Sequence, residues 1–154
     1  LERVPAMAYE PKDVLKQRGR MLFIDRIKHW TDDEAQCTVI VGKNRSFVDA
    51  YERVPAWLGL EYMCQAIAAL EGIKRLQQGQ MILISFVLGS RLVKCDTSFF
   101  CVGDHLLVEV ENEMKIGGAV GVYACRIKLN DKLLMHAQIK GIMSEDPYNI
   151  IYRG

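Results

Sequence analysis

Hydrophobic and polar residues follow two different periods along this chain. From Pro55 to about Leu76, apolar side chains recur at helical spacing, and "QQGQ" closes the pattern. Before this segment, "MLFIDRIKHW" and "CTVIVGK" are typical of two strands joined by the turn "TDDEAQ". After it come four strand-like runs separated by short turns, the first run being interrupted at Gly89 as at a β-bulge. The predicted order is two strands, one long helix and four strands.

This order predicts an α+β fold in which an antiparallel sheet of about six strands wraps around one long central helix. The helix is apolar around nearly its whole circumference, so the sheet must cover most of it. A single sheet layer leaves one side of the helix and the strand edges open, and a second copy of the chain is the natural cover. We therefore expect residues 1–154 to form one domain that assembles as a homodimer or a larger even oligomer.

Composition and charge exclude several classes of protein. Half of the residues are apolar and 25% are charged, which is ordinary for a globular domain. The net charge of +1, without a run of Lys or Arg, gives no basis for nucleic-acid binding. No apolar stretch reaches transmembrane length without interruption, and the start "LERVPAMAYEPKDV" is unlike a signal peptide. The sequence therefore predicts a cytoplasmic protein that is not inserted in a membrane.

The cysteines give little sign of a disulfide or metal framework. There are five of them, an odd number, and no two have the CxxC spacing of a metal or redox motif. We expect them to be small buried hydrophobic residues in a reducing compartment. A nucleophilic cysteine is the alternative, although no His lies near one in sequence.

Two polar residues stand inside the apolar helix "VPAWLGLEYMCQAIAAL". Glu61 and Gln65 are four residues apart, so they share one face of the helix, one turn above the other. Burying a carboxylate is costly unless another group pairs with it or uses it. Glu61 is thus a candidate functional residue. The alternative is that both residues are exposed to solvent or tied to backbone elsewhere.

Three stretches resemble the hotdog-fold 3-hydroxyacyl-acyl-carrier-protein dehydratases of fatty-acid synthesis, and their order and spacing along the chain resemble that family too. "LKQRGRMLFIDRI" is similar to the opening segment of that family, and "CVGDHLLVEVE" to its Pro-Gly-Asp-x-Leu strand start. "VPAWLGLEYMCQA" is similar to the central-helix motif Met-Pro-Gly-x-x-x-x-Glu-x-x-x-Gln, with Pro55, Glu61 and Gln65 at matching positions. "PAWLGLEYMCQ" and "VLGSR" also resemble a divergent branch found with bacterial aryl-polyene pigment gene clusters.

The resemblance implies a hotdog fold and dehydration of a 3-hydroxyacyl thioester. In that family a loop His and a helix carboxylate, from opposite subunits, transfer the protons, so Glu61 is implied as the carboxylate and Gln65 as its hydrogen-bonding or water-holding neighbour. The chemistry needs no cofactor and no metal. The residues implied to contact substrate are Phe47, Pro55, Ala56, Trp57, Gly59 and Gly89. For Trp57, packing in the core or at the dimer interface is the alternative.

The implied partner is an acyl carrier protein, or coenzyme A, that holds the acyl group as a thioester. Carrier proteins are acidic, so a basic rim is expected near the mouth of the site. Lys74, Arg75, Arg91 and Lys94 are the candidates, and ordinary solvated charges are the alternative.

The chain departs from the family pattern at the His. Counting back from Glu61, the family's loop His falls at Phe47, and "NRSFVDAYERV" contains no His. The three histidines of the chain, His29, His105 and His136, have the positions of structural residues in or beside strands. Three functions stay open: a dehydratase with altered machinery, a non-catalytic hotdog subunit that pairs with a catalytic partner, and an acyl thioesterase.

Overall fold

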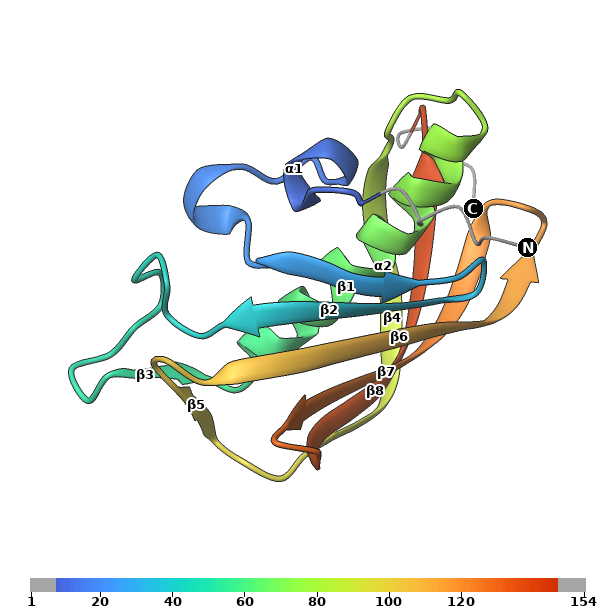
Figure 1. Ribbon diagram of the computed structural model, residues 1–154. Helices are drawn as coiled ribbons and strands as arrows, with labels where there is room; N and C mark the ends of the chain where they lie inside the picture. The colour runs from blue at the N-terminus through green and yellow to red at the C-terminus, as the bar shows by residue number, and fades with distance from the viewer. Residues whose placement is uncertain (1–7, 147–154) are drawn as a thin grey trace, which may run out of the picture.

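The computed structural model describes residues 8–146. A six-stranded antiparallel sheet wraps around one long helix, as the alternation of polar and apolar residues predicts (Figure 1). The elements in chain order are α1 (Pro11–Val14), the 3₁₀ turn η1 (Gly19–Met21), β1 (Arg26–Trp30), β2 (Glu34–Ile40), β3 (Arg53–Pro55), α2 (Leu58–Gln77), β4 (Ile84–Cys95), β5 (Phe99–Cys101), β6 (His105–Ile116), β7 (Val120–Leu129) and β8 (Lys132–Ser144).

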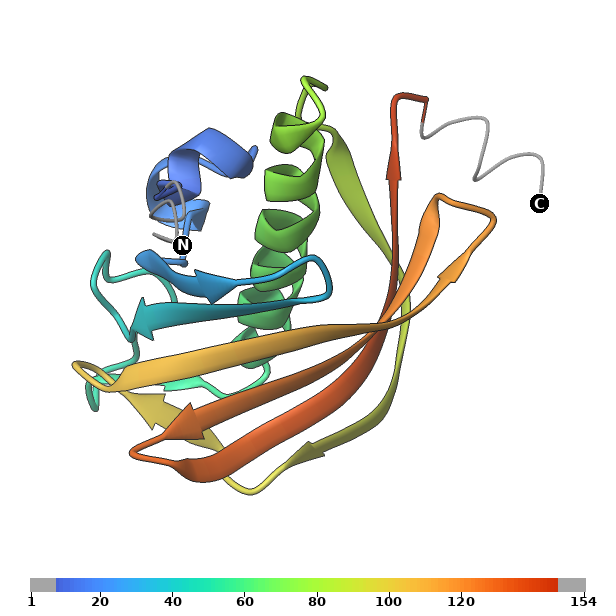
Figure 2. The same ribbon diagram turned by 45° about the vertical axis from the view of Figure 1, so that its right-hand side comes forward.

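The strands of the large sheet lie in the order β1-β2-β6-β7-β8-β4. Each strand of the middle of the sheet turns alternate side chains toward α2; in β6 these are Leu106, Val108 and Val110, all buried. The sheet curves around the helix, which lies along its concave face (Figure 2). The core is therefore the space between α2 and the inner face of the sheet.

The helix begins later than the sequence predicts. Pro55 is the last residue of β3, where it pairs with Phe99 of β5, and the Ala56 amide donates a hydrogen bond to the Ser98 carbonyl. This pairing holds the chain extended, so α2 starts at Leu58 instead of in the first turn after Pro55. The small sheet of β3 and β5 was not expected, because three-residue strands carry too little periodicity to recognise.

The loop between β2 and β3 projects from the body near the N-terminal end of α2 (Figure 1). Three residues other than glycine adopt positive φ angles in it: Arg45 at 63°, Phe47 at 63° and Glu52 at 57°. A bidentate ion pair between Arg45 and Glu52 holds the two sides of the loop together. The loop therefore has a defined conformation, although it has no regular secondary structure.

Strand β4 forms an open edge of the sheet. Its pairing with β8 is interrupted between Val87 and Gly89, so the bulge predicted at Gly89 is present, and again between Arg91 and Lys94. The apolar side chains of β4 are unusually exposed. They are Ile84, Val87, Leu88, Leu92 and Val93.

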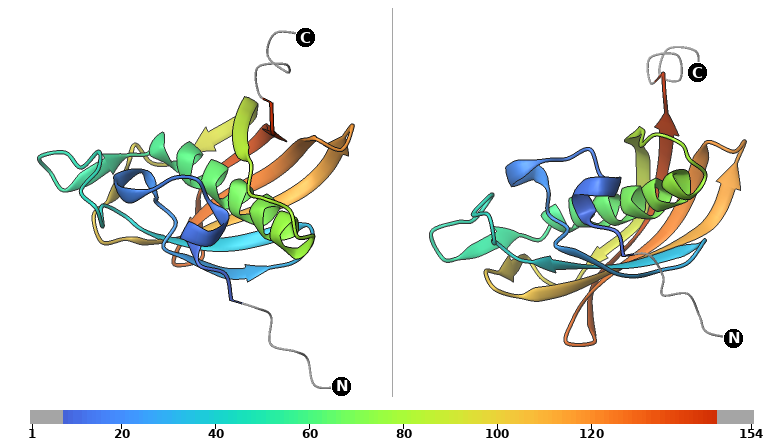
Figure 3. Two further views of the ribbon diagram at one scale, coloured as in Figure 1. Left: turned by 90° about the horizontal axis from the view of Figure 1, so that it is seen from above. Right: turned by 45° about the horizontal axis from the view of Figure 1, so that its top comes forward.

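The N-terminal turns lie beside α2, opposite the sheet (Figure 3). Gly72 permits the close approach, because a Cβ on this residue would stand 2.5 Å from the Val14 carbonyl oxygen. No helix within residues 8–146 is both long and apolar enough to cross a membrane.

Candidate active site

The centre of the candidate site is a hydrogen-bond network around Gln65, which is completely buried. Its side-chain oxygen accepts a hydrogen bond from the Phe23 amide at 2.9 Å. Its side-chain nitrogen donates to the Met21 carbonyl at 2.7 Å and to Oε1 of Glu61 at 2.8 Å. Gln65 therefore ties the segment before β1 to α2 and fixes the orientation of the Glu61 carboxylate.

Glu61 is half-buried and faces a pocket of about 330 Å³ between α2 and the sheet. Within residues 8–146, its second carboxylate oxygen has no hydrogen-bond partner. A carboxylate with one oxygen held by an amide and the other free can exchange a proton with a bound molecule.

The pocket runs along one stripe of α2, and we call it the trough. The stripe has the spacing of every third or fourth residue that places side chains on one helix face. Its residues are Glu61, Cys64, Ala68, Glu71 and Arg75. The small side chains of Cys64 and Ala68 form its middle, whereas charged side chains stand at both ends. At 1.5 Å per residue, the stripe is about 21 Å long.

The opposite wall of the trough is mostly apolar and comes from the sheet. Phe86 and Val87 belong to β4, and Ile139, Ile142 and Met143 to β8. Such a wall suits a hydrocarbon chain better than a polar ligand. The trough thus combines the Glu61 carboxylate with a mostly apolar wall.

A second polar cluster links α2 to the far ends of β6 and β7. Glu71 Oε1 accepts a hydrogen bond from the Tyr123 hydroxyl at 2.8 Å and pairs with Lys115 Nζ at 2.7 Å and Lys74 Nζ at 3.2 Å. Burial alone raises the pKa of Glu71, but hydrogen bonds from Lys115 and Tyr123, and the nearby ammonium groups, lower it overall. Burial and the Glu71 charge raise the pKa of Tyr123, so its hydroxyl remains a donor.

None of the three histidines reaches the trough. His29 and His105 are exposed. His136 lies between the buried residues Met135 and Ala137 of β8, so its side chain points to the outer face of the sheet. The imidazole that the family chemistry uses is therefore missing from the surroundings of Glu61 in this chain.

Phe47 and Trp57 lie together outside the trough. Their rings form an edge-to-face contact with centroids 5.7 Å apart, and 47% and 60% of their surfaces are exposed. Phe47 also contacts Phe23, the residue whose amide is bound by Gln65. These aromatic side chains do not touch the pocket that Glu61 faces.

The remaining residues implied to contact substrate are also set apart from the trough. Pro55 and Ala56 pair with the β5 segment. Gly59 faces the sheet, where a Cβ would stand 2.6 Å from Met135 Sδ, so its closest approach is to core side chains. Gly89 sits in the exposed bulge of β4, two residues beyond the trough-lining Val87.

The cysteines differ from the expectation of uniform burial. Cys37 and Cys125 are buried, but Cys95 and Cys101 are exposed, because they lie on edge strands with no covering element. Cys64 is half-buried in the trough, and burial together with the charge of Glu61 raises the pKa of its thiol to about 12. Its thiol is therefore protonated near neutral pH, which argues against a nucleophilic role.

The four basic residues expected at a rim are not equivalent. Lys74 is paired with Glu71, and Arg75 donates to the Met81 carbonyl. Arg91 and Lys94 are exposed on β4 and, among the described residues, have no ion-pair partner. In the part of the chain that the structure describes, no group of three or more metal-binding side chains occurs.

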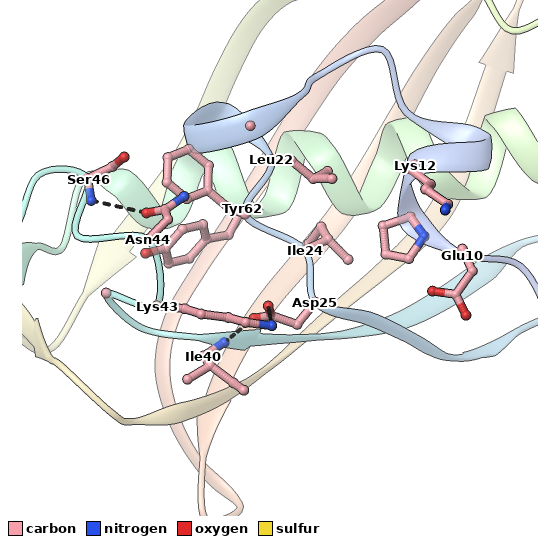
Figure 4. Close-up of a pocket in the computed structure, with 14 residues that line it drawn as sticks. Glu10, Lys12, Leu22, Ile24, Asp25, Ile40, Lys43, Asn44, Ser46 and Tyr62 are labelled. Carbon is pink, nitrogen blue, oxygen red and sulfur yellow. Dashed lines mark hydrogen bonds and ion pairs between the residues drawn. The ribbon is translucent and has the colours of Figure 1, made fainter.

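A larger cavity, of about 440 Å³, lies on the other side of α2 between the N-terminal turns and residues 42–46 (Figure 4). Asp25 anchors one wall, since it accepts hydrogen bonds from Lys43 and the Ile40 amide. Tyr62 contributes to this cavity, but Glu61 and Gln65 do not. The trough, although smaller, is therefore the candidate site, because Glu61 lines it.

Most of the residues that line the trough were not predicted from the sequence. Glu61 and Gln65 stand out as polar residues in an apolar helix, but Cys64 and Ala68 look like ordinary core residues. The one available signal was the continuation of the Glu61 face at Ala68, Glu71 and Arg75. Lys115 and Tyr123 carried no signal, because only the tertiary fold brings them to the helix.

Solved structures of other proteins share this fold. The Dehydratase Heterocomplex ApeI:P from Xenorhabdus doucetiae matches with a TM-score of 0.87 and 18% identity, over 96% of this chain and 99% of that chain. A sigma28-regulated virulence protein from Campylobacter jejuni matches with 0.66 and 11%, over 88% and 96%. A hypothetical thioesterase from Streptococcus pneumoniae, solved with coenzyme A, matches with 0.57 and 17%, over 77% and 84%. These likenesses confirm the expected hotdog fold.

Family-level comparison is more specific. No curated protein matches the chain in sequence. The model of the ApeP-like family, described as ApeP dehydratase, matches residues 9–151, nearly the whole chain. This match confirms the resemblance to the hotdog dehydratases and to their aryl-polyene branch. The chain belongs to the ApeP-like dehydratase family and is a dehydratase-like hotdog protein.

Proposed function

We propose that this chain provides Glu61 as the carboxylate acid/base in the dehydration of 3-hydroxyacyl thioesters, in a site that a partner hotdog subunit completes with a His. The observation that carries the proposal is the state of Glu61. It is half-buried, Gln65 orients it, one of its oxygens has no hydrogen-bond partner among the described residues, and it lines a trough whose sheet wall is mostly apolar. Gln65 is then a positioning residue. Its own hydrogen bonds to the Met21 and Phe23 backbone leave it no freedom to act on substrate.

The reaction requires one base and one acid on a 3-hydroxyacyl group. A base takes a proton from C2, the electrons of that C–H bond form the C2–C3 double bond, and the C3 hydroxyl leaves as water after receiving a proton. Glu61 can accept or deliver one of these protons. The second proton needs another titratable group, and no His of this chain lies beside Glu61.

The open edge of β4 is evidence that a partner subunit binds there. An exposed edge strand with five exposed apolar side chains favours aggregation unless another chain covers it. Residues 85–87 of the same strand line the trough, so a chain seated against β4 also closes the trough from that side. The structure from Xenorhabdus doucetiae is described as a dehydratase heterocomplex, which supports a different protein as the partner, whereas a second copy of this chain brings no His to the loop.

We infer an acyl carrier protein or coenzyme A as the other partner. Arg91 and Lys94 on β4 have no ion-pair partner within residues 8–146, and their charges suit an acidic carrier or a phosphate. The five free thiols fit a reducing compartment, so we place the protein in the cytoplasm.

A second candidate function is a non-catalytic hotdog subunit. The position of the family His is occupied here by Phe47, whose ring packs against Trp57 and has no acid/base chemistry. In this alternative the chain contributes surface and stability to a partner, and Glu61 serves only to satisfy Gln65. Thioester hydrolysis by Glu61 is the third outcome that an assay must distinguish.

The test is turnover of a 3-hydroxyacyl thioester by the purified chain alone, by a hotdog protein with a His in the loop before its central helix, and by their mixture. The proposal predicts little turnover by this chain alone and a gain of about 100-fold or more over either protein in the mixture. Release of free thiol without loss of water indicates a thioesterase. Turnover by the partner that is unchanged by adding this chain overturns the proposal.

A further inference from the structure

The trough contains a polar crossing that the proposed chemistry does not use. Glu71 of α2, Tyr123 of β7 and Lys115 of β6 contact one another directly, and we call these three residues the bridge. Lys115 Nζ also lies 3.1 Å from the Tyr123 hydroxyl, so each member contacts both others. All three line the same pocket as Glu61.

The bridge joins the helix to the sheet across the trough. It ties the second half of α2 to the ends of β6 and β7 that lie on its side of the curved sheet (Figure 2). Tyr123 is nearly fully buried, and the Glu71 side chain is 12% exposed. Gly121 leaves room for this arrangement, because a Cβ there would stand 2.4 Å from the Tyr123 hydroxyl oxygen.

Between Glu61 and the bridge the trough is apolar. Ten residues separate Glu61 from Glu71, which corresponds to about 15 Å along the helix. Cys64 and Ala68 form the helical side of this segment, and Ile139 and Ile142 lie on the sheet side. Burial of a hydrocarbon chain against these side chains is favourable, up to the point where the chain meets the charged groups of the bridge.

We propose that the bridge sets the length of the acyl chain that the trough accepts, an inference that rests on the proposed function. A chain with its reacting carbons at Glu61 fills about 15 Å of apolar channel and ends at the bridge. A longer chain must separate Glu71 from Lys115 and Tyr123, or place methylene groups against a half-buried ion pair. The first removes charge-assisted hydrogen bonds without supplying a replacement, and the second takes water away from charged groups.

The experiment measures binding of butyryl-, octanoyl-, dodecanoyl- and palmitoyl-coenzyme A to the full chain by titration calorimetry. The wild type is compared with Glu71→Ala/Lys115→Ala, which removes both charges of the bridge and leaves Lys74 without its Glu71 partner, and with the milder Tyr123→Phe. Glu109→Gln is the matched control, because Glu109 is also paired with a lysine across strands, but on the outer face of the sheet.

For the wild type we expect affinity to rise with chain length and then to stop rising or fall at palmitoyl. The double variant is expected to bind palmitoyl-coenzyme A about tenfold more tightly and butyryl-coenzyme A as the wild type does, with Tyr123→Phe intermediate and Glu109→Gln unchanged. If the bridge only stabilises the fold, its removal does not change how affinity depends on acyl-chain length. An unfolding midpoint measured on each variant separates loss of fold from loss of binding.

Two results overturn the inference. If the variants alter the affinity for all lengths equally, or for none, the bridge does not select chain length, although the proposed function stands. If the folded wild type binds no acyl-coenzyme A of any length, the proposed function fails and the inference fails with it.

Discussion

The side-chain amide of Gln65 holds the carboxylate of Glu61 at 2.8 Å while its other hydrogen-bonding positions are taken by backbone groups more than forty residues away. The amide nitrogen donates hydrogen bonds to the Met21 carbonyl and to Glu61, and the amide oxygen accepts one from the Phe23 amide. The orientation of Glu61 thus depends on how the segment before β1 packs against α2. The orientation of Glu61 and the stability of the fold are therefore linked through one residue, Gln65.

Replacing Gln65 by Leu should lower the free energy of unfolding by about 2–4 kcal/mol, because the buried Phe23 amide loses a partner worth about 1–3 kcal/mol and the partly buried Met21 carbonyl loses one worth about 1 kcal/mol. Urea denaturation measures the loss. Glu61→Gln is the control and should cost less than about 1 kcal/mol, because a Gln oxygen still accepts the hydrogen bond from Gln65. Equal stability of Gln65→Leu and wild type contradicts the network described here.

Gly72→Ala should destabilise the protein by about 1–3 kcal/mol, although Ala is the better helix former. The added Cβ meets the Val14 carbonyl oxygen at 2.5 Å, a backbone atom that cannot move without shifting α1. Gly59→Ala should cost less, because its nearest contact is the flexible Met135 sulfur at 2.6 Å. Thermal unfolding of the two variants side by side tests the order, and a stabilised Gly72→Ala contradicts it.

Stability should fall in acid partly through Glu71. Its pKa is lower in the folded state than in the unfolded state, so its charge stabilises the folded protein at neutral pH, and this contribution is lost as pH falls below about 5. In Glu71→Gln the free energy of unfolding should be lower at pH 7 and should decline less between about pH 5 and pH 3. If the free energy of unfolding declines equally with falling pH in the wild type and in Glu71→Gln, the charge of Glu71 does not stabilise the folded state.

The two exposed thiols should react well before Cys64. Cys95 and Cys101 lie at the surface, whereas the Cys64 thiol, with its pKa raised to about 12, is protonated at mildly alkaline pH. Peptide mass spectrometry after timed treatment with iodoacetamide at about pH 8 gives the order of modification. Faster labelling of Cys64 than of Cys95 would revive the nucleophilic alternative, and dehydratase turnover by Cys64→Ser would then decide it.

The elements that depend on local periodicity were predictable, and those that depend on tertiary contacts were not. The long helix and the alternation in β6 follow from side-chain spacing, and the bulge at Gly89 from the glycine that interrupts the strand pattern. Pro55 looked like a helix start because proline favours that position, but pairing with Phe99 keeps it in a strand.

The site divides in the same way. The spacing of Glu61 and Gln65 shows that they share a helix face, but the partners of Gln65 at Met21 and Phe23 are set by the packing of a distant segment. Tyr123 and Lys115 reach Glu71 only because the register of β6 and β7 brings both strands to that level of the helix. Exposed edge strands explain why Cys95 and Cys101 are not buried.

The most direct test of the central claim is the turnover number for dehydration of a 3-hydroxyacyl thioester by the proposed complex of this chain with a hotdog protein that has a His in the loop before its central helix, wild type beside Glu61→Gln. The substitution retains the hydrogen bond from Gln65 and removes only the ability to exchange a proton. We predict a fall of about 100-fold or more in kcat with little change in KM and an unchanged unfolding midpoint. Equal turnover by the two complexes contradicts a catalytic role for Glu61 and favours the non-catalytic subunit.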